Sequence, residues 1–127
     1  MSSSKPVVFV RCVAVASLFA SLFASLASTA LAHHGWSEYD SATLLTISGT
    51  IEESSYEHPH GYIKLKAPGK TWVAVLAPPS RMDNRGLSKE LLKAGATATV
   101  EGYANRDKPE EMRAERITLG GKTTELR

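Results

Sequence analysis

A run of 21 uncharged residues, Cys12 to Ala32, leaves 95 of the 127 residues to build a folded domain. The run is rich in alanine, leucine, valine and phenylalanine, follows the cations Lys5 and Arg11, and ends in Ala-Leu-Ala. A charged start, an apolar middle and a small-residue end are typical of a cleaved signal peptide. We therefore expect residues 1–32 to be removed and the protein to be periplasmic or secreted.

The same run is almost long enough to span a membrane, so a membrane anchor is the alternative. Serine or threonine interrupts it at five positions, and no cationic cluster follows it. Cations flanking an apolar span on the cytoplasmic side are the usual mark of a membrane helix. We expect no stable membrane anchor after cleavage.

Cleavage also changes the charge balance. The chain has 15 Lys and Arg against 13 Asp and Glu, and the two surplus cations, Lys5 and Arg11, both lie in the predicted signal peptide. The remaining domain is neutral, which removes the main electrostatic argument for binding nucleic acid. The only cysteine, Cys12, is lost as well, so neither a disulfide framework nor a cysteine-based zinc site is expected.

The residues after the run contain short segments rich in β-branched residues. These segments predict strands at 43–54, 61–66, 71–77, 96–103 and 112–119, and the polar tail after them can add one short strand. Between the third and fourth strands, Pro79 and Ser88 are placed to begin helical turns that end at Gly86 and Gly95.

This order predicts one mainly β domain over residues 33–127. We expect a small five-stranded Greek-key barrel of OB type, with one short helix between strands 3 and 4. A small SH3-like barrel and a β-sandwich are the alternatives, although closing the sheet best protects the strand edges at this size. The predicted core consists of Ile47, Ile51, Ile63, Leu65, Trp72, Val73, Val75, Leu91, Leu92, Val100, Ile117 and Leu119.

Two segments of the domain carry histidine motifs. Residues 33–36 read His-His-Gly-Trp, and residues 56–60 read Tyr-Glu-His-Pro-His. These segments resemble motifs of a family of small exported bacterial proteins of unassigned function. The family's usual patterns are His-His-x-Trp at the mature N-terminus and Trp-x-Asn-Pro-His after the first strand, so Tyr56 and His58 depart from them. The resemblance implies export, a barrel-like fold and a role for His33, His34 and His60, but it implies no activity.

His33 would be the first residue of the mature protein. Its α-amine and its Nδ1 nitrogen can then close a six-membered chelate ring on a metal ion, and His34 adds a second imidazole. Amine and imidazole nitrogens suit copper, nickel and zinc, with copper(II) favoured by the Irving–Williams order. We predict a copper site here, with zinc or nickel possible; the alternative is a flexible polar start without a ligand.

Two further histidines flank Pro59 in the loop after the first predicted strand. Proline favours extended backbone at the residue before it, and residues two apart in an extended chain point to the same side. We therefore predict His60 as a further ligand and His58 as an optional one. The alternative is that both side chains only cap a turn. We expect Trp36 and Tyr39 to be apolar anchors of the N-terminus.

The leading prediction is an exported metal-binding barrel that is not an enzyme. No nucleophile elbow, phosphate-binding glycine loop, His-Glu-x-x-His or dinucleotide fingerprint is present in the sequence. The alternative is a metal-free OB-like module that binds a small ligand or a protein, with Tyr56, Tyr62 and Trp72 as a stacking face. For Arg81, Arg85 and Arg106 we expect surface ion pairs rather than an anion site.

Overall fold

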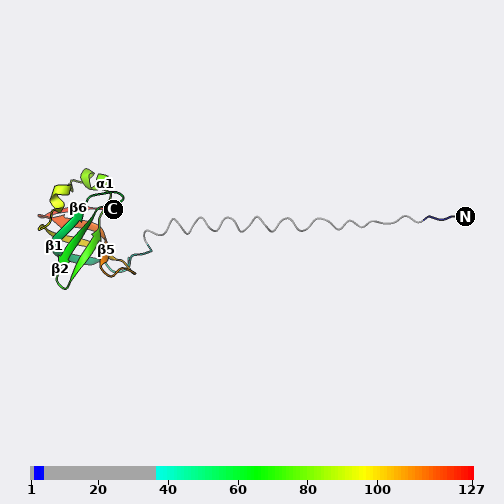
Figure 1. Ribbon diagram of the computed structural model, residues 1–127, viewed down its shortest axis with the longest axis horizontal. Helices are drawn as coiled ribbons and strands as arrows, with labels where there is room; N and C mark the ends of the chain where they lie inside the picture. Colours follow the sequence, from blue (N-terminus) through cyan, green and yellow to red (C-terminus); the bar gives the residue numbers. More distant parts are fainter. Residues whose placement is uncertain (1, 5–36) are drawn as a thin grey trace. The chain divides into compact units, whose positions relative to one another are not determined.

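The computed structural model describes residues 2–4 and 37–127 (Figure 1). Residues 37–127 contain six strands, with a short α-helix and a 3-10 helix between β3 and β4. The predicted cleavage site and the predictions for Cys12, His33, His34 and Trp36 lie outside the described residues. The elements are β1 (Leu45–Ser55), β2 (Tyr62–Ala67), β3 (Lys70–Val75), α1 (Pro79–Asn84), η1 (Lys89–Leu92), β4 (Thr97–Ala104), β5 (Glu111–Leu119) and β6 (Lys122–Glu125).

The strands form one sheet in the order β3-β2-β1-β4-β5-β6, and β3 also pairs with β5. The β3–β5 pairing is parallel and joins Val73 to Glu111 and Val75 to Arg113, while the other pairings are antiparallel. This pairing closes β1 to β5 into a barrel and leaves β6 as an additional strand on β5. The predicted five-stranded barrel with a short helix between strands 3 and 4 is therefore confirmed.

The eleven-residue strand β1 pairs with two neighbours, one along each half. Its first half, Leu45–Thr50, pairs with β4, and its second half, Thr50–Ser55, pairs with β2. A register shift between Ile51 and Glu53 bends the strand as it passes from one neighbour to the other. Gly49 lies just before this bend, and a β-carbon there would overlap the carbonyl oxygen of Lys66.

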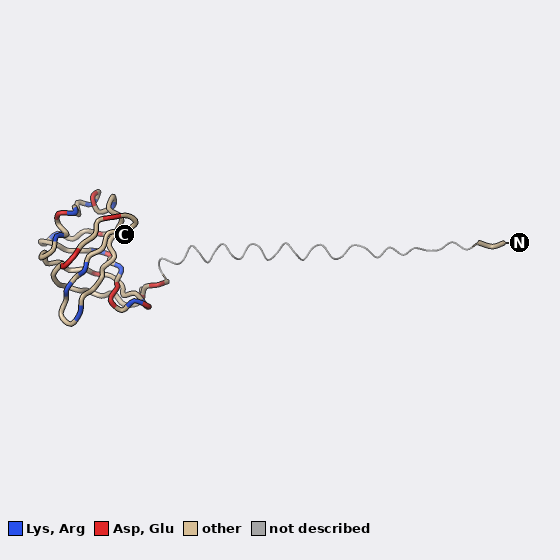
Figure 2. The backbone as a smooth tube through the Cα atoms, viewed as in Figure 1, with Lys and Arg blue, Asp and Glu red and all other residues tan. Residues whose placement is uncertain are grey.

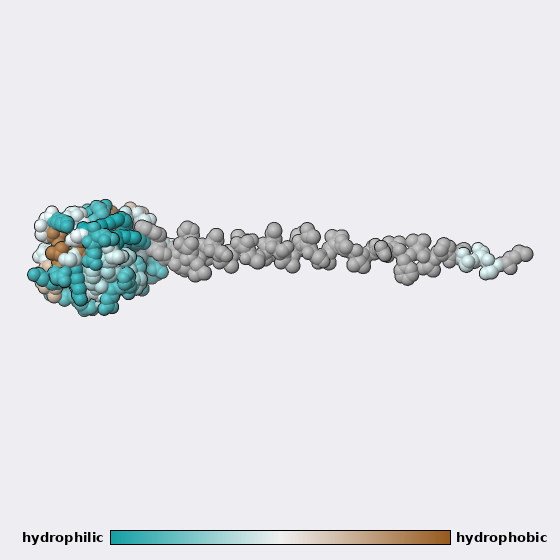
Figure 3. Space-filling model, turned by 90° about the horizontal axis from the view of Figure 1, so that it is seen from above, coloured by the Kyte–Doolittle hydropathy of each residue, from teal (hydrophilic) through white to brown (hydrophobic). Residues whose placement is uncertain are grey.

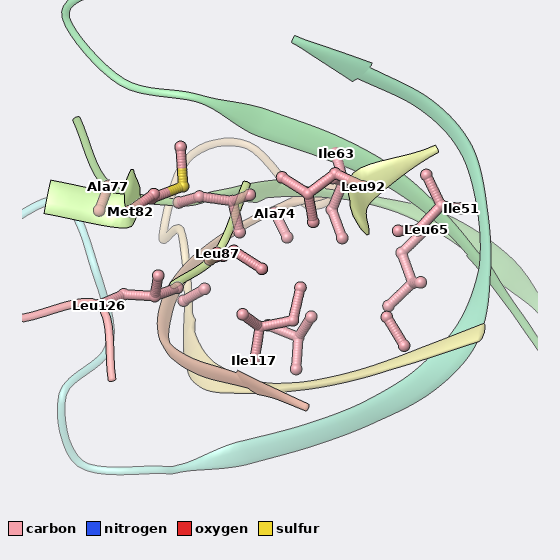
Figure 4. Close-up of a cluster of buried hydrophobic side chains, with 14 of the residues drawn as sticks. Ile51, Ile63, Leu65, Ala74, Ala77, Met82, Leu87, Leu92, Ile117 and Leu126 are labelled. Atoms are coloured by element: carbon pink, nitrogen blue, oxygen red, sulfur yellow. The ribbon is translucent and has the colours of Figure 1, made fainter. Parts of the chain in front are cut away.

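The core fills the barrel and extends under α1 (Figure 4). Its strand residues alternate with outward-facing ones, as in β2, where Ile63 and Leu65 are buried. Figure 4 shows that residues outside the strands complete the core at the α1 end, because Met82, Leu87 and Leu126 lie there with Ala77.

The predicted core was wrong at three positions. Val73 and Val75 are only partly buried because β3 alternates, so that Ala74 and Leu76 take the inward positions. Leu91 is 45% exposed, because the short 3-10 helix η1 turns only its neighbour Leu92 into the core.

Two arginines of the α1 segment cover the open edge of β6. Arg85 Nη1 donates to the carbonyl oxygens of Glu125 at 2.7 Å and Arg127 at 2.9 Å, and Arg81 Nη1 donates to that of Leu126 at 3.2 Å. An uncovered edge strand offers free carbonyl groups to other chains. The pairing of α1 with the C-terminal segment protects this edge, and both lie at the same end of the barrel (Figure 1).

Charges of both signs are intermixed along the backbone of the domain (Figure 2). Figure 3 shows a mainly hydrophilic face with a smaller hydrophobic area on the barrel. The large hydrophobic side chains exposed on the described residues are Leu44 and Leu91. Within residues 2–4 and 37–127, no helix is long and apolar enough to cross a membrane.

Gly102 lies at a close approach of β4 to β5, and this contact can be tested. A β-carbon at Gly102 would overlap the carbonyl oxygen of Arg113, whereas one at Gly69 meets no atom within 4 Å. We expect Gly102→Ala to lower the free energy of unfolding in urea by about 3 kcal/mol through overpacking, because the overlapping atom belongs to the backbone. Gly69→Ala is the control and should cost about 1 kcal/mol, because only its positive φ is unfavourable. Equal costs at the two positions would contradict the close approach.

Candidate functional site

The two predicted ligands that the structure describes, His58 and His60, lie in the loop between β1 and β2. Both residues are exposed, and the His58–Pro59 peptide bond is cis. No group of three or more histidine, cysteine, aspartate or glutamate side chains in the described part of the chain is arranged to hold a metal ion. A metal site that uses His58 or His60 would therefore need ligands from residues outside the described ranges, such as His33 and His34.

His60 lies where β3 leads into α1. The next residue, Gly61, donates its N–H to the carbonyl oxygen of Ala77 at 3.0 Å, and its own carbonyl accepts from Leu76 N–H at 2.8 Å. These bonds extend the β2–β3 ladder by one step beyond Tyr62 and Val75. The backbone next to His60 is thereby paired with the segment that leads from β3 into α1.

Three arginines act electrostatically on His60. Partial burial of the imidazole lowers the pKa of His60 below its ordinary value, and the positive charges of Arg127, Arg113 and Arg81 lower it further. The imidazole is therefore neutral at neutral pH, which is the form that binds metals. The same positive charges oppose any cation beside the ring, whether a proton or a metal ion.

The hydroxyl of Tyr56 is used within the fold. It lies 2.7 Å from Asp83 Oδ1 and 2.6 Å from the carbonyl oxygen of Leu87, and the ring packs against the core. Burial and the hydrogen bond to Asp83 raise the pKa of Tyr56. Tyr56 therefore ties the β1–β2 loop to α1 and to the segment after it.

The other two aromatic residues of the predicted stacking face lie on different surfaces. Tyr62 points outward from β2, where its hydroxyl donates to Glu53 Oε1 at 3.1 Å. Trp72 lies on the inward side of β3 and packs against the core, with Lys70 Nζ 3.5 Å from its ring centroid. The structure does not bring Tyr56, Tyr62 and Trp72 together, and binding of a ligand by any one of them stays a prediction.

Tyr39 anchors the segment that leads from the N-terminus into the barrel, as predicted. Its side chain is 9% exposed, and its hydroxyl donates to Glu111 Oε1 at 2.7 Å. Burial and the hydrogen bond to Glu111 raise the pKa of Tyr39 to about 12. On either side, Asp40 N–H donates to Ala104 O at 2.9 Å and Arg106 N–H to Glu38 O at 2.7 Å. The chain is fixed to the barrel from residue 38 onward.

The sequence predicted surface ion pairs for Arg81, Arg85 and Arg106, and this prediction was wrong. In the described residues Arg81, Arg85 and Arg106 form no ion pairs, and each donates to backbone carbonyl oxygens. Sequence reasoning also missed Arg113 and Arg127, which lie near His60. The available indication was that Arg113 alternates with the buried Met112 and Ala114, which places it on the outer surface of β5.

Comparisons with known proteins identify a family for the chain and no activity. The model of a family of unknown function (DUF6152) matches residues 20–113. No curated protein matches the chain. A crystal structure of TiaS in complex with a tRNA and ATP is similar with a TM-score of 0.47 and 16% identity over 63% of this chain. The chain spans only 18% of that protein, and similarity at this level says nothing about function.

Removal of the Tyr56 hydroxyl tests its structural role. Tyr56→Phe loses the contacts with Asp83 and Leu87, so we expect the free energy of unfolding to fall by about 1–2 kcal/mol. Tyr103→Phe is the matched control and should change it little. Equal stability of both variants and the unchanged protein, measured by urea unfolding, would contradict this role.

The lowered pKa of His60 predicts a pH dependence of stability. Unfolded histidine has a pKa of about 6.5, so the unfolded chain takes up a proton at His60 more readily than the folded domain does. The contribution of His60 to the free energy of unfolding is therefore lost as the pH falls through about 6.5. We expect the free energy of unfolding to change less between neutral pH and about pH 5 in His60→Gln than in the unchanged protein. His58→Gln serves as the matched control, and an unchanged difference in His60→Gln would contradict the assignment.

Proposed function

The chain belongs to the family of unknown function DUF6152, and from its own residues we propose that it is an exported protein that binds a transition-metal ion, first of all copper, through His33 and His34. His33 supplies its α-amine and imidazole after cleavage behind Ala32, and His34 supplies a second imidazole. The ion is bound or carried in the periplasm, and no catalytic role is assigned to the site.

The anchoring of Tyr39 is the observation that supports this proposal. His34 precedes Tyr39 by five residues, and five residues of extended chain reach at most about 18 Å. The length of the intervening chain therefore limits how far His34 can lie from Tyr39. A tethered pair of ligands loses less conformational freedom on binding than a free segment does.

His60 is the weaker ligand in this proposal. The Tyr39 hydroxyl donates a hydrogen bond to Glu111, and Glu111 pairs with Val73 of β3. The residue after His60, Gly61, bonds to Ala77, which follows β3 in the chain. The three arginines around His60 oppose a cation, so the proposal treats His60 and His58 as secondary ligands.

The metal-free alternative lacks the aromatic surface on which it was based. Tyr56 is bonded within the fold, Trp72 packs against the core, and Tyr62 alone points outward. A metal-free ligand would have to use a different surface of the barrel.

Titration with copper(II), followed by EPR, tests the proposed site. The protein that begins at His33 should bind one equivalent with the spectrum of a tetragonal nitrogen site. Retention of Ala32 blocks the His33 amine, so we expect affinity to fall by a factor of about ten or more. His34→Ala should weaken binding similarly.

His60→Ala and His58→Ala are the matched controls, since both remove an imidazole outside the proposed chelate. We expect either change to reduce the affinity less than His34→Ala does. Equal and weak binding by the proteins that begin at Ala32 and at His33 would overturn the chelate. A mature N-terminus at another residue, found by sequencing the exported protein, would overturn it as well.

A further inference from the structure

The outer face of β3 is more apolar than its position on the barrel surface requires. Residues 72–77 read Trp-Val-Ala-Val-Leu-Ala, a continuous apolar run in β3 and just after it. Such a run is typical of a strand that is covered on both faces. In the barrel, Ala74 and Leu76 are buried in the core, whereas Val73 and Val75 face outward and stay partly exposed. This is the composition of a strand whose outer face also makes contacts.

Strand pairing places three further side chains beside the two valines. Tyr62 of β2 lies opposite Val75, and Lys64 of β2 lies opposite Val73. On the other side of β2, Glu53 of β1 lies opposite Lys64. Neighbouring strands are about 4.8 Å apart, so these five outward side chains share one small area of the sheet. We call them the β2–β3 face.

Hydrogen bonds hold the polar side chains of the β2–β3 face together. The Tyr62 hydroxyl donates to Glu53 Oε1 at 3.1 Å, and Lys64 Nζ donates to Glu53 Oε2 at 2.9 Å. Both contacts direct the Tyr62 ring and the Lys64 chain towards β1. The hydrogen bonds from Lys64 and Tyr62 lower the pKa of Glu53, so its carboxylate is an acceptor at neutral pH. The side chains of Glu53 and Lys64 are 50% and 43% exposed, so a ligand from solvent can reach both.

The charge and size of the face limit what it can bind. Glu53 and Lys64 balance each other, and Lys66, the next outward residue of β2, lies opposite Thr71, beyond the valines. This balance gives no electrostatic advantage to a nucleic acid or another polyanion. Three partly exposed apolar side chains are also too few for a stable protein interface, which buries about 800 Å² on each partner. A small uncharged ligand with an apolar side and several hydroxyl groups fits both limits.

We propose that the β2–β3 face binds a pyranose unit of a neutral oligosaccharide. The C–H face of the sugar ring lies against Tyr62 and Val75, where the aromatic ring supplies most of the apolar contact area. Glu53 accepts hydrogen bonds from sugar hydroxyls, and Lys64 donates to them. Apolar contact area with a few fixed polar groups is the usual composition of a small-ligand site. The site goes beyond the proposed metal function and requires none of its histidines.

NMR titration of the protein that begins at His33, in the presence of a metal chelator, tests the site, since the barrel has its own core. The probes are cellotetraose and chitotetraose, which are neutral, and tetragalacturonate, which is anionic. We expect a neutral sugar to shift the backbone amides of Tyr62, Lys64 and Val75 saturably, and tetragalacturonate to bind at least about tenfold more weakly. Saturation by chitotetraose alone would assign a ligand with N-acetyl groups, and saturation by cellotetraose alone would assign an unsubstituted glucan.

Four variants of the face and one control make the result specific. Tyr62→Ala should weaken sugar binding by about tenfold, whereas Tyr62→Phe keeps the ring and should weaken it by less than about threefold. Val75→Thr replaces a methyl group by a hydroxyl, and Glu53→Gln removes the charged acceptor; each should weaken binding by about threefold. Tyr103→Ala removes a partly exposed tyrosine of β4 and should leave binding unchanged. Urea unfolding of each variant shows that it is folded at the start.

Several results would overturn the proposal. These are the absence of saturable shifts with both neutral sugars, equal binding by Tyr62→Ala and Tyr103→Ala, or binding of tetragalacturonate as tight as that of the neutral sugars. A dimer in light scattering that is lost in Tyr62→Ala would assign the face to a second copy instead. Because the chelator removes metal, failure here leaves the copper result unaffected. A negative copper titration likewise leaves the sugar result standing.

Discussion

The parallel pairing of β3 with β5 is the contact on which the rest of the structure depends. It joins residues that are about forty positions apart in the sequence and turns an open sheet into a closed barrel. Closure removes two strand edges and encloses the buried faces of five strands. It also places Arg113 beside Val75, whose other neighbour, Tyr62, lies two residues after His60.

Closure also explains why the two ends of the barrel differ. At one end, α1 and the C-terminal segment cover the core, and Arg81 and Arg85 bond to the edge of β6. At the other, the segment around Tyr39 lies along the β4–β5 loop.

Most of the fold could be predicted because its information is local. Alternation of apolar residues placed the strands, and Pro79 and Gly86 placed α1. The errors in the core arose where a choice between neighbours depended on distant contacts, as between Leu91 and Leu92. Met82, Leu87 and Leu126 belong to segments without a strand pattern, and only the position of those segments over the barrel buries them.

The candidate site was less predictable than the fold. The sequence by itself determined which residues offer imidazole nitrogens and that His33 follows an Ala-Leu-Ala pattern, and these are the grounds of the proposed metal site. Only the tertiary structure decided the surroundings of His60, because Arg81, Arg113 and Arg127 reach it through strand pairing and helix packing. It likewise separated Tyr56, Tyr62 and Trp72. The physical reason is that local periodicity fixes which face of an element a side chain occupies, whereas barrel closure fixes which distant side chains share that surface.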